Sequence, residues 1–395
     1  MNKASEVMNN LRNRAEKILD SQISPFWLGL RDREYGGFFG RKDVELRLHD
    51  DADKGSIMIS RILYFFSEYY AVSGLREHLD AANAAYDFLI NCCKDKENGG
   101  VFWSVTYKGG KADTVKHTYA QAFAIYALSS YYIATHYTDA LLEAIKLFYL
   151  IEEKCTDENG YLESFDEDWG PICNDKLSEN NVTAERTMNT LLHIFEAYSY
   201  LYRCVKLNKI EKAMKRILDI YIRKVYNSEK RRQEVFFDIN YNSLIDLHSF
   251  GHDIESSWLI DYGCELLHDK ALKKDVFQID AELAQQVYNE AFDGECVMNE
   301  SESDMVDNDR IWWVQCEAVV GFVNQWQKEG ELKYLEAAEK VFNYIQEHLV
   351  DKRSGSEWLW GIHDDGSMME KDVAGEWKCP YHNGRMCFEI IRRSR

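Results

Sequence analysis

The sequence predicts an all-α fold, an (α/α)6 barrel of six helical hairpins joined by short β-hairpin loops. Three observations support this prediction. Only three prolines occur in 395 residues. Apolar residues recur at the helical period of 3.6 over long segments, which favours helices. A short strand-like segment with glycine or polar punctuation also returns roughly every 60 to 75 residues, the length of one supersecondary unit.

The recurring segments divide the chain into similar units. They lie at residues 36–40, 99–103, 159–163, 234–238, 293–297 and 355–360. Each interval has room for two helices, and in the second unit we expect an inner helix from about Val115 to Tyr132 and an outer helix from about Asp139 to Glu153. Helical hairpins cannot bury both faces alone and therefore stack. Six hairpins can close into a barrel, and an open superhelix is the alternative.

The chain is expected to form one domain over residues 1–395, because no stretch rich in proline, glycine or serine interrupts it. The formal net charge of −20 argues against nucleic-acid and membrane partners. The ten cysteines form no CxxC pair, residues 1–20 are polar and amphipathic rather than a signal peptide, and no apolar run reaches the roughly 18 residues of a membrane span. We therefore expect a cytoplasmic monomer with free thiols.

Polar and aromatic residues gather at one position of each unit, in the loop before the inner helix or in its first turns. Unit by unit they are Asp53, Lys54 and Arg61; Lys116, His117 and Tyr119; Asn189 and His193; His248, His252, Glu255 and Trp258; Arg310, Trp312, Trp313 and Glu317; Trp377, His382 and Arg385. Equivalent helices of a closed ring start at the same end. These side chains are therefore expected to point into one central cavity, where a ligand site belongs.

The fourth unit carries the sharpest motif, residues 248–255. His252 and Glu255 are three residues apart and share a helix face, so Glu255 is expected to hold the imidazole of His252 in one tautomer and to support its charged form. His248 and His252 have the spacing of metal ligands, but the segment lacks the glutamate of HExxH. We expect neither a metal nor another cofactor.

The fifth and sixth units add two tryptophans and a second histidine. Trp312 and Trp313 are neighbours on a helix, about 100° apart, so one is expected to face the cavity and the other the packing. His382 begins the last inner helix after a loop that tightens at Pro380. A histidine in such a place is preorganised and partly exposed, which favours a catalytic histidine over a core one.

The chain resembles the N-acylglucosamine 2-epimerase superfamily from end to end. Seven motifs carry the resemblance, in order and at matching spacing: residues 25–27 with 36–38, 52–55 leading to 60–63, 116–119, 187–189 leading to His193, 248–255, 312–315 with Glu317, and 377–385. The last two motifs look more like the branch that epimerises disaccharides than the branch that epimerises acylated amino sugars.

The resemblance implies an (α/α)6 barrel and an isomerase that inverts C2 of the reducing-end glucose in a β-1,4-linked disaccharide, without nucleotide or metal. By motif match, His252 and His382 are the proton-transfer pair. The remaining implied residues are Arg61, Asn189, His193 and Glu255, which assist, and Tyr119, Trp313 and Trp377, which contact the sugar. The cavity argument adds His248, Trp258, Trp312 and Glu317 as substrate-binding residues.

These residue types suit that chemistry. The C2 proton of an aldose is acidic only once the ring opens and C1 is a carbonyl, and epimerisation then passes through a cis-enediol or its anion. Two histidines, with an ordinary pKa near 6.5, can exchange the roles of base and acid, and Arg61 is the natural partner of the oxyanion. Our hypothesis is that His382 serves ring opening and one C2 proton transfer, and that His252 serves the other.

Other functions stay open at this point. Within the superfamily, the same two histidines would serve an N-acylglucosamine 2-epimerase or an aldose–ketose isomerase acting on mannose. An inverting glycoside hydrolase would use Glu255 and Glu317 as its two carboxylates. A non-catalytic carbohydrate- or protein-binding module needs the aromatic rings but not two histidines on separate segments. The expected partner in the leading interpretation is a small oligosaccharide such as cellobiose or lactose.

Overall fold

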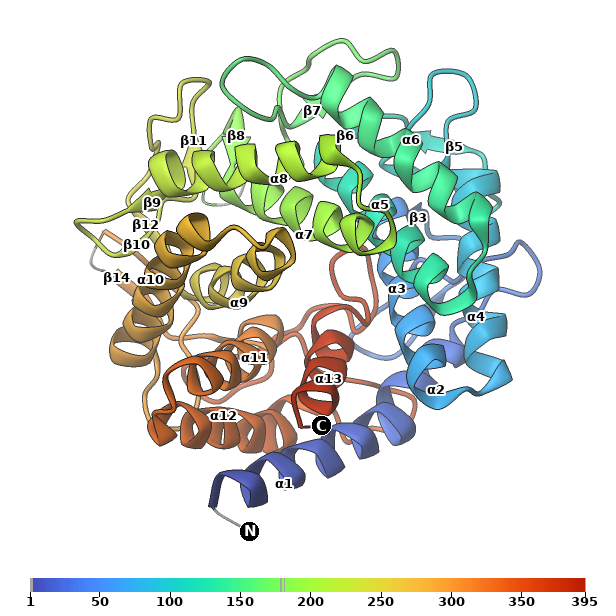
Figure 1. Cartoon of the computed structure of the whole chain (residues 1–395). Coiled ribbons are helices and arrows are strands. Elements are labelled where there is room, and N and C mark those ends of the chain that lie inside the picture. Colours follow the sequence, from blue (N-terminus) through green and yellow to red (C-terminus); the bar gives the residue numbers. More distant parts are fainter. Residues whose placement is uncertain (1–2, 178–179, 181, 304, 395) are drawn as a thin grey trace.

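The computed structural model describes residues 3–177, 180, 182–303 and 305–394, and over these residues the chain is mostly helical. Six helices lie at the centre: α3 (Ser56–Ser73), α5 (Thr118–Thr135), α7 (Met188–Cys204), α9 (Phe250–Leu267), α11 (Trp312–Glu329) and α13 (His382–Arg393). Each contacts the next in this order, and α13 contacts α3. The six inner helices therefore stand around a common centre (Figure 1).

A second set of helices covers the outside: α1 (Lys3–Ile18), α4 (Arg76–Phe88), α6 (Thr138–Lys154), α8 (Asn208–Ile220), α10 (Lys270–Gln286) and α12 (Leu332–Tyr344). Each of these from α4 to α12 packs on the inner helix before it in the chain, whereas α1 packs on α13. The first and last helices of the chain thus complete the arrangement together (Figure 1). No helix among the described residues is both long and apolar enough to cross a membrane.

Repetition extends to the ends of the outer helices. Five of them pass into a five-residue π-helical turn: η1 (Leu19–Ile23), η2 (Leu89–Cys93), η3 (Tyr221–Val225), η4 (Val287–Ala291) and η5 (Ile345–Leu349). A short helix, α2 (Ser24–Gly29), follows the first of these turns. The same local geometry in five units agrees with the repeat predicted from the sequence.

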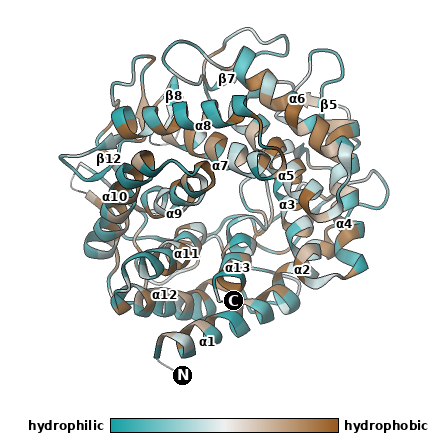
Figure 2. Cartoon of the chain, in the orientation of Figure 1, coloured by the Kyte–Doolittle hydropathy of each residue, from teal (hydrophilic) through white to brown (hydrophobic). Residues whose placement is uncertain are grey.

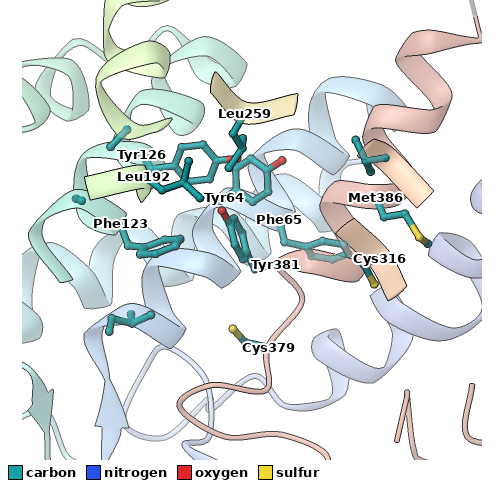
Figure 3. Close-up of a cluster of buried hydrophobic side chains, with 14 of the residues drawn as sticks. Tyr64, Phe65, Phe123, Tyr126, Leu192, Leu259, Cys316, Cys379, Tyr381 and Met386 are labelled. Carbon is teal, nitrogen blue, oxygen red and sulfur yellow. The ribbon is translucent and has the colours of Figure 1, made fainter. Parts of the chain in front are cut away.

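Inner and outer helices differ in how much of their surface is buried. In α5 every residue from 118 to 131 is buried, whereas α8 buries a single face that includes Ile210, Met214 and Ile217. Hydrophilic and hydrophobic turns accordingly alternate along the outer helices (Figure 2). Aromatic side chains of the inner helices pack together in the core, where Tyr64 stacks on Tyr126 with ring centroids 4.5 Å apart (Figure 3).

Short antiparallel ladders lie in the loops between the hairpins. The main pairs are β3 (Lys54–Gly55) with β4 (Ser104–Val105), β6 (Lys116–His117) with β7 (Ser164–Phe165), β8 (Arg186–Thr187) with β11 (Phe236–Phe237), β12 (Leu247–Ser249) with β13 (Glu300–Glu302), and β15 (Arg310–Ile311) with β16 (Gly361–Ile362). The others are β5 (Lys111–Asp113) on β4, β14 (Met305–Asp307) on β13, β1 (Arg41–Lys42) with β2 (Leu48–His49), and β9 (Tyr226–Asn227) with β10 (Arg232–Gln233). Five of the six strand-like segments predicted from the sequence contribute only isolated bridges, and the ladders lie a few residues further on.

A cation two residues before an inner helix binds a carboxylate of the preceding turn in four units. The buried ion pairs are Lys54–Asp32 at 2.6 Å, Lys116–Asp95 at 2.7 Å, Arg186–Asp157 at 2.5 Å and Arg310–Asp293 at 2.8 Å. These contacts fix where each inner helix begins. Lys54, Lys116 and Arg310 therefore hold the fold and do not point into the central cavity as the sequence predicted.

Candidate active site

Two histidines from different helices lie against one indole ring. His252 is in the first turn of α9 and His382 is the first residue of α13. The ring centroid of Trp313 is 4.9 Å from that of His252 and 5.4 Å from that of His382. Trp313 is partly exposed, whereas Trp312 is only 1% exposed and lies beneath the ammonium of Lys378. One tryptophan thus faces the histidines and the other the packing, as their angular separation predicts.

Both histidines are held from behind through Nδ1. The Nδ1 atom of His252 is hydrogen-bonded to Oγ of Ser249 at 2.7 Å, and Nδ1 of His382 donates to Oε1 of Glu317 at 2.7 Å. Burial and the neighbouring His193 lower the pKa of His252 to about 3. Burial, with the charges of Arg385 and Arg61, lowers the pKa of His382 well below its ordinary value. Each ring can therefore present a neutral Nε2 to a ligand.

The predicted role of Glu255 as the partner of His252 is wrong. Glu255 accepts a hydrogen bond from Arg385, and its Oε1 lies 3.9 Å from Nε2 of His193 and 4.0 Å from Nδ1 of His382. Burial and the nearby charge of Glu317 raise the pKa of Glu255 to about 7. The side chain of Glu255 belongs to a buried network beneath the histidines, because the first turn of α9 directs His252 and Glu255 to different neighbours.

Arg385 is the centre of that network. Its Nη1 donates to Oε1 of Glu196 at 2.6 Å and its Nη2 donates to Oε1 of Glu317 at 2.7 Å. Glu196 also accepts from Nδ1 of His193 at 2.8 Å and from the Tyr381 hydroxyl at 2.6 Å. The sequence analysis gave Arg385 no role and missed Glu196 and Tyr381. The spacing of His193 and Glu196 by three residues was the available signal.

Arg61 is a buried cation with an unusual environment. Its Nη2 donates to the Tyr119 hydroxyl at 2.9 Å, and its guanidinium lies 4.3 Å from the ring centroid of Phe123 and 4.6 Å from that of Tyr381. Its Nε is buried without a hydrogen-bond partner, and no carboxylate within the described ranges forms an ion pair with it. The half-buried ring of Trp377 lies 6.0 Å away. Arg61 thus supplies positive charge that no protein anion neutralises.

Other predicted site residues lie behind this layer. His248 takes the position that a lysine or arginine holds before four other inner helices, and its Nε2 lies 2.8 Å from Oδ2 of Asp253 while its Nδ1 lies 3.5 Å from Oε2 of Glu290. Nε1 of Trp258 donates to Glu317 at 3.0 Å. His248, Trp258, Trp312 and Glu317 therefore do not line the cavity as predicted, because their polar atoms are bound by protein partners or, in Trp312, fully covered.

Two residues of the second and third units complete the picture. His117 is fully buried, bonds Asn174 at 3.2 Å, and has its pKa lowered by burial to about 4, so it belongs to the packing. Asn189 is partly exposed at the start of α7, and its Oδ1 has no hydrogen-bond partner among the described residues. Asn189 can therefore offer a free carbonyl oxygen to a ligand.

One group of side chains has the chemistry of metal ligands. Within the described part of the chain, Glu255, Glu317 and His382 alone bring three possible ligand atoms within 4.8 Å of one another. The same Nη2 of Arg385 donates to both carboxylates. The guanidinium thus occupies the place between the carboxylates that a cation would take. The two carboxylates are also closer together than the roughly 6.5–9.5 Å that an inverting glycoside hydrolase needs.

Comparisons with known proteins agree with one another. Residues 36–384 match the family described as N-acylglucosamine 2-epimerase (GlcNAc 2-epimerase). A cellobiose 2-epimerase of Eubacterium cellulosolvens is 46% identical over 95% of this chain and 97% of its own. A sugar epimerase from a ruminal bacterium has a similar structure, with a TM-score of 0.95 and 44% identity over 96% of this chain and 98% of its own. The cellobiose 2-epimerase of Bacillus thermoamylovorans has a TM-score of 0.94 and 39% identity over 98% and 100%.

Proposed function

Because this chain belongs to the N-acylglucosamine 2-epimerase family and is a carbohydrate epimerase, we propose that it inverts C2 of the reducing-end glucose in β-1,4-linked disaccharides. Cellobiose would give glucosyl-mannose, and lactose would give epilactose. Relatives named cellobiose 2-epimerase, similar over nearly their full lengths, support this substrate. We also infer that the two sets of helices form an (α/α)6 barrel and that residues 1–395 are one catalytic domain.

The observation that carries the proposal is the pair of histidines around Trp313. His252 and His382 come from different helices, and each is bound at Nδ1 by the protein. A two-base epimerisation needs a proton carrier for each face of C2, and this arrangement supplies two Nε2 atoms. His252 is the neutral base in the direction we describe. A protonated His382 with a depressed pKa is a strong acid, which suits proton donation to carbon. The two roles exchange in the reverse reaction.

The oxyanion of the enediolate needs a fixed positive charge. Arg61 supplies it, because no protein carboxylate neutralises its guanidinium and the stacked rings of Phe123 and Tyr381 keep it in one plane. Tyr119 and Asn189 offer hydrogen bonds beside it, and Trp313 and Trp377 offer faces to the sugar. No step of this scheme requires a nucleotide or a metal. Cofactor independence, a monomeric state and a cytoplasmic location stay predictions.

The test is proton NMR of cellobiose incubated with the protein in D₂O, without added metal or nucleotide. We expect a mannose-type reducing end that carries deuterium at C2. Release of glucose would instead indicate a hydrolase. The matched family is described as N-acylglucosamine 2-epimerase, so N-acetylglucosamine with ATP is the second substrate to offer, and mannose, with fructose as the expected product, is the third. An unchanged spectrum with all three sugars would contradict the proposal.

A further inference from the structure

A single guanidinium joins three inner helices beneath the two histidines. Arg385, on α13, is 1% exposed and binds Glu196 of α7, Glu255 of α9 and Glu317 of α11. Its guanidinium also lies 4.2 Å from the ring centroid of Tyr381 and 4.9 Å from that of Trp258. Both ends of the guanidinium fork are therefore used, and rings hold its plane.

Each of these carboxylates lies next to an imidazole. Glu196 is bonded to Nδ1 of His193 at 2.8 Å and Glu317 to Nδ1 of His382 at 2.7 Å. A neutral imidazole that donates from Nδ1 carries its lone pair on Nε2. The position of each carboxylate thus decides which nitrogen of the histidine can act as a base.

We propose that Arg385 is the positioning residue of this centre: it fixes Glu196 and Glu317 as acceptors for His193 and His382, so that both imidazoles keep a basic Nε2. The inference rests on the proposed function, which needs His382 in that tautomer. Arg385 does not touch the sugar in this scheme and acts only through the carboxylates.

The charge of Arg385 has a second consequence. Burial favours the neutral acid of Glu196, yet Arg385 and His193 outweigh this effect and lower the pKa of Glu196 to about 2. Arg385 also lowers the pKa of His382, after burial. The remaining charges that act on His382 are Arg61, His193 and His252, which lower its pKa, and Glu317 and Glu255, which face it. Removing the guanidinium should therefore raise the pKa of His382, and removing the charge of Glu196 should lower it.

Four variants separate positioning from general stability. They are Arg385→Lys, Arg385→Met, Glu196→Gln and, as the matched control, Arg393→Met. Arg393 lies on the same helix and over the same ring of Trp258, at 5.9 Å, but binds Asn324 and Glu389 rather than the network. The pH profile of kcat/KM for cellobiose is measured for each, because its acidic limb reports the histidine that must be neutral.

We expect opposite shifts from the two charge changes. Arg385→Met should move the acidic limb to higher pH, and Glu196→Gln should move it to lower pH. Arg385→Lys should keep the limb and lose about tenfold or more in kcat, because one ammonium cannot bridge three carboxylates. Arg393→Met should leave both quantities unchanged. Shifts of the same sign, an unshifted limb in Glu196→Gln, or full activity in Arg385→Lys would overturn the proposal; these last two variants decide if Arg385→Met does not fold.

A readout without substrate separates this inference from the proposed function. The ¹⁵N chemical shifts of the imidazoles report which nitrogen of His382 and His193 is protonated. We expect one fixed tautomer in the wild type and Arg393→Met, and mixed tautomers in Arg385→Lys. The same tautomers in all three proteins would overturn the role of Arg385 even if cellobiose is epimerised. A change confined to Arg385→Lys would support it even if another sugar is the substrate.

Discussion

Nδ1 of His382 lies 2.7 Å from Oε1 of Glu317, a carboxylate that is 1% exposed and also accepts from Trp258 and Arg385. Burial raises the pKa of Glu317, and Arg385 and the Trp258 hydrogen bond oppose this effect. Because the contact stabilises a proton on His382, Glu317→Gln should reduce kcat about 10²-fold while KM changes much less. Steady-state kinetics with cellobiose measure both constants.

The control for Glu317 is Glu389→Gln. Glu389 is a buried carboxylate on α13 that pairs with Arg392 and Arg393 rather than with the network. It should keep wild-type kcat. Equal losses of kcat in the two variants would mean that the Glu317 effect is one of general stability.

Removing either histidine should stop epimerisation but leave one face of the chemistry. In His252→Ala and His382→Ala we expect turnover to fall about 10³-fold or more, because each variant lacks the proton carrier for one face of C2. The histidine that remains can still exchange the C2 proton of one epimer. In D₂O, deuterium should therefore enter one of the two epimers without conversion to the other.

His348→Ala is the control for both histidine variants, because its side chain is half exposed at the end of an outer helix. It should retain wild-type activity. Near wild-type epimerisation by either His252→Ala or His382→Ala would contradict the two-histidine scheme.

Arg61→Met should abolish activity without harming the fold. The guanidinium has no carboxylate partner, so its removal leaves no buried anion unpaired, and we expect a thermal midpoint equal to or above that of the wild type. The loss in kcat/KM should be about 10²- to 10³-fold, the usual effect of removing an oxyanion donor. Calorimetry and kinetics on the same sample measure both effects. Normal kinetics would remove Arg61 from the site, and a large drop in the midpoint would show that Arg61 is structural.

The sequence predicted the repeat well because its signals are local. The predicted helices 115–132 and 139–153 correspond to α5 and α6, which begin at Thr118 and Thr138. The inner helix begins three residues later than predicted because Lys116 and His117 pair with β7. The ion pairs before the inner helices also had a local signal, since Asp32 and Asp95 each come shortly before a glycine pair.

The second layer of the site could not be predicted in the same way. Whether a residue at the start of an inner helix faces the centre or its neighbour depends on a rotation of about 100° per residue. Trp312 and Trp313 illustrate this, because the sequence gives their separation but not their orientation. Arg385 meets Glu196 across 189 residues of chain, and a contact between residues so far apart leaves no periodic pattern in one sequence.

Asp280, on the outer helix α10, predicts how stability depends on pH. Its side chain is 3% exposed and neither oxygen has a hydrogen-bond partner among the described residues. Burial, and next the charge of Asp261, raise its pKa well above 3.8. The raised folded pKa means that its stability contribution is complete below pH 3.8 and is lost as the pH rises, by about 1.4 kcal/mol per pH unit until the folded pKa is reached.

Asp280→Asn removes this titration. The variant should therefore be more stable than the wild type at pH 7 to 8, by about 1–3 kcal/mol, and the difference should vanish towards pH 4. Denaturant unfolding at several pH values measures the free energy of unfolding of both proteins. Asp275→Asn, an exposed position on the same helix, should leave the curve unchanged. A wild-type curve parallel to that of Asp280→Asn would show that Asp280 gains a partner or water in solution and ionises there at an ordinary pH.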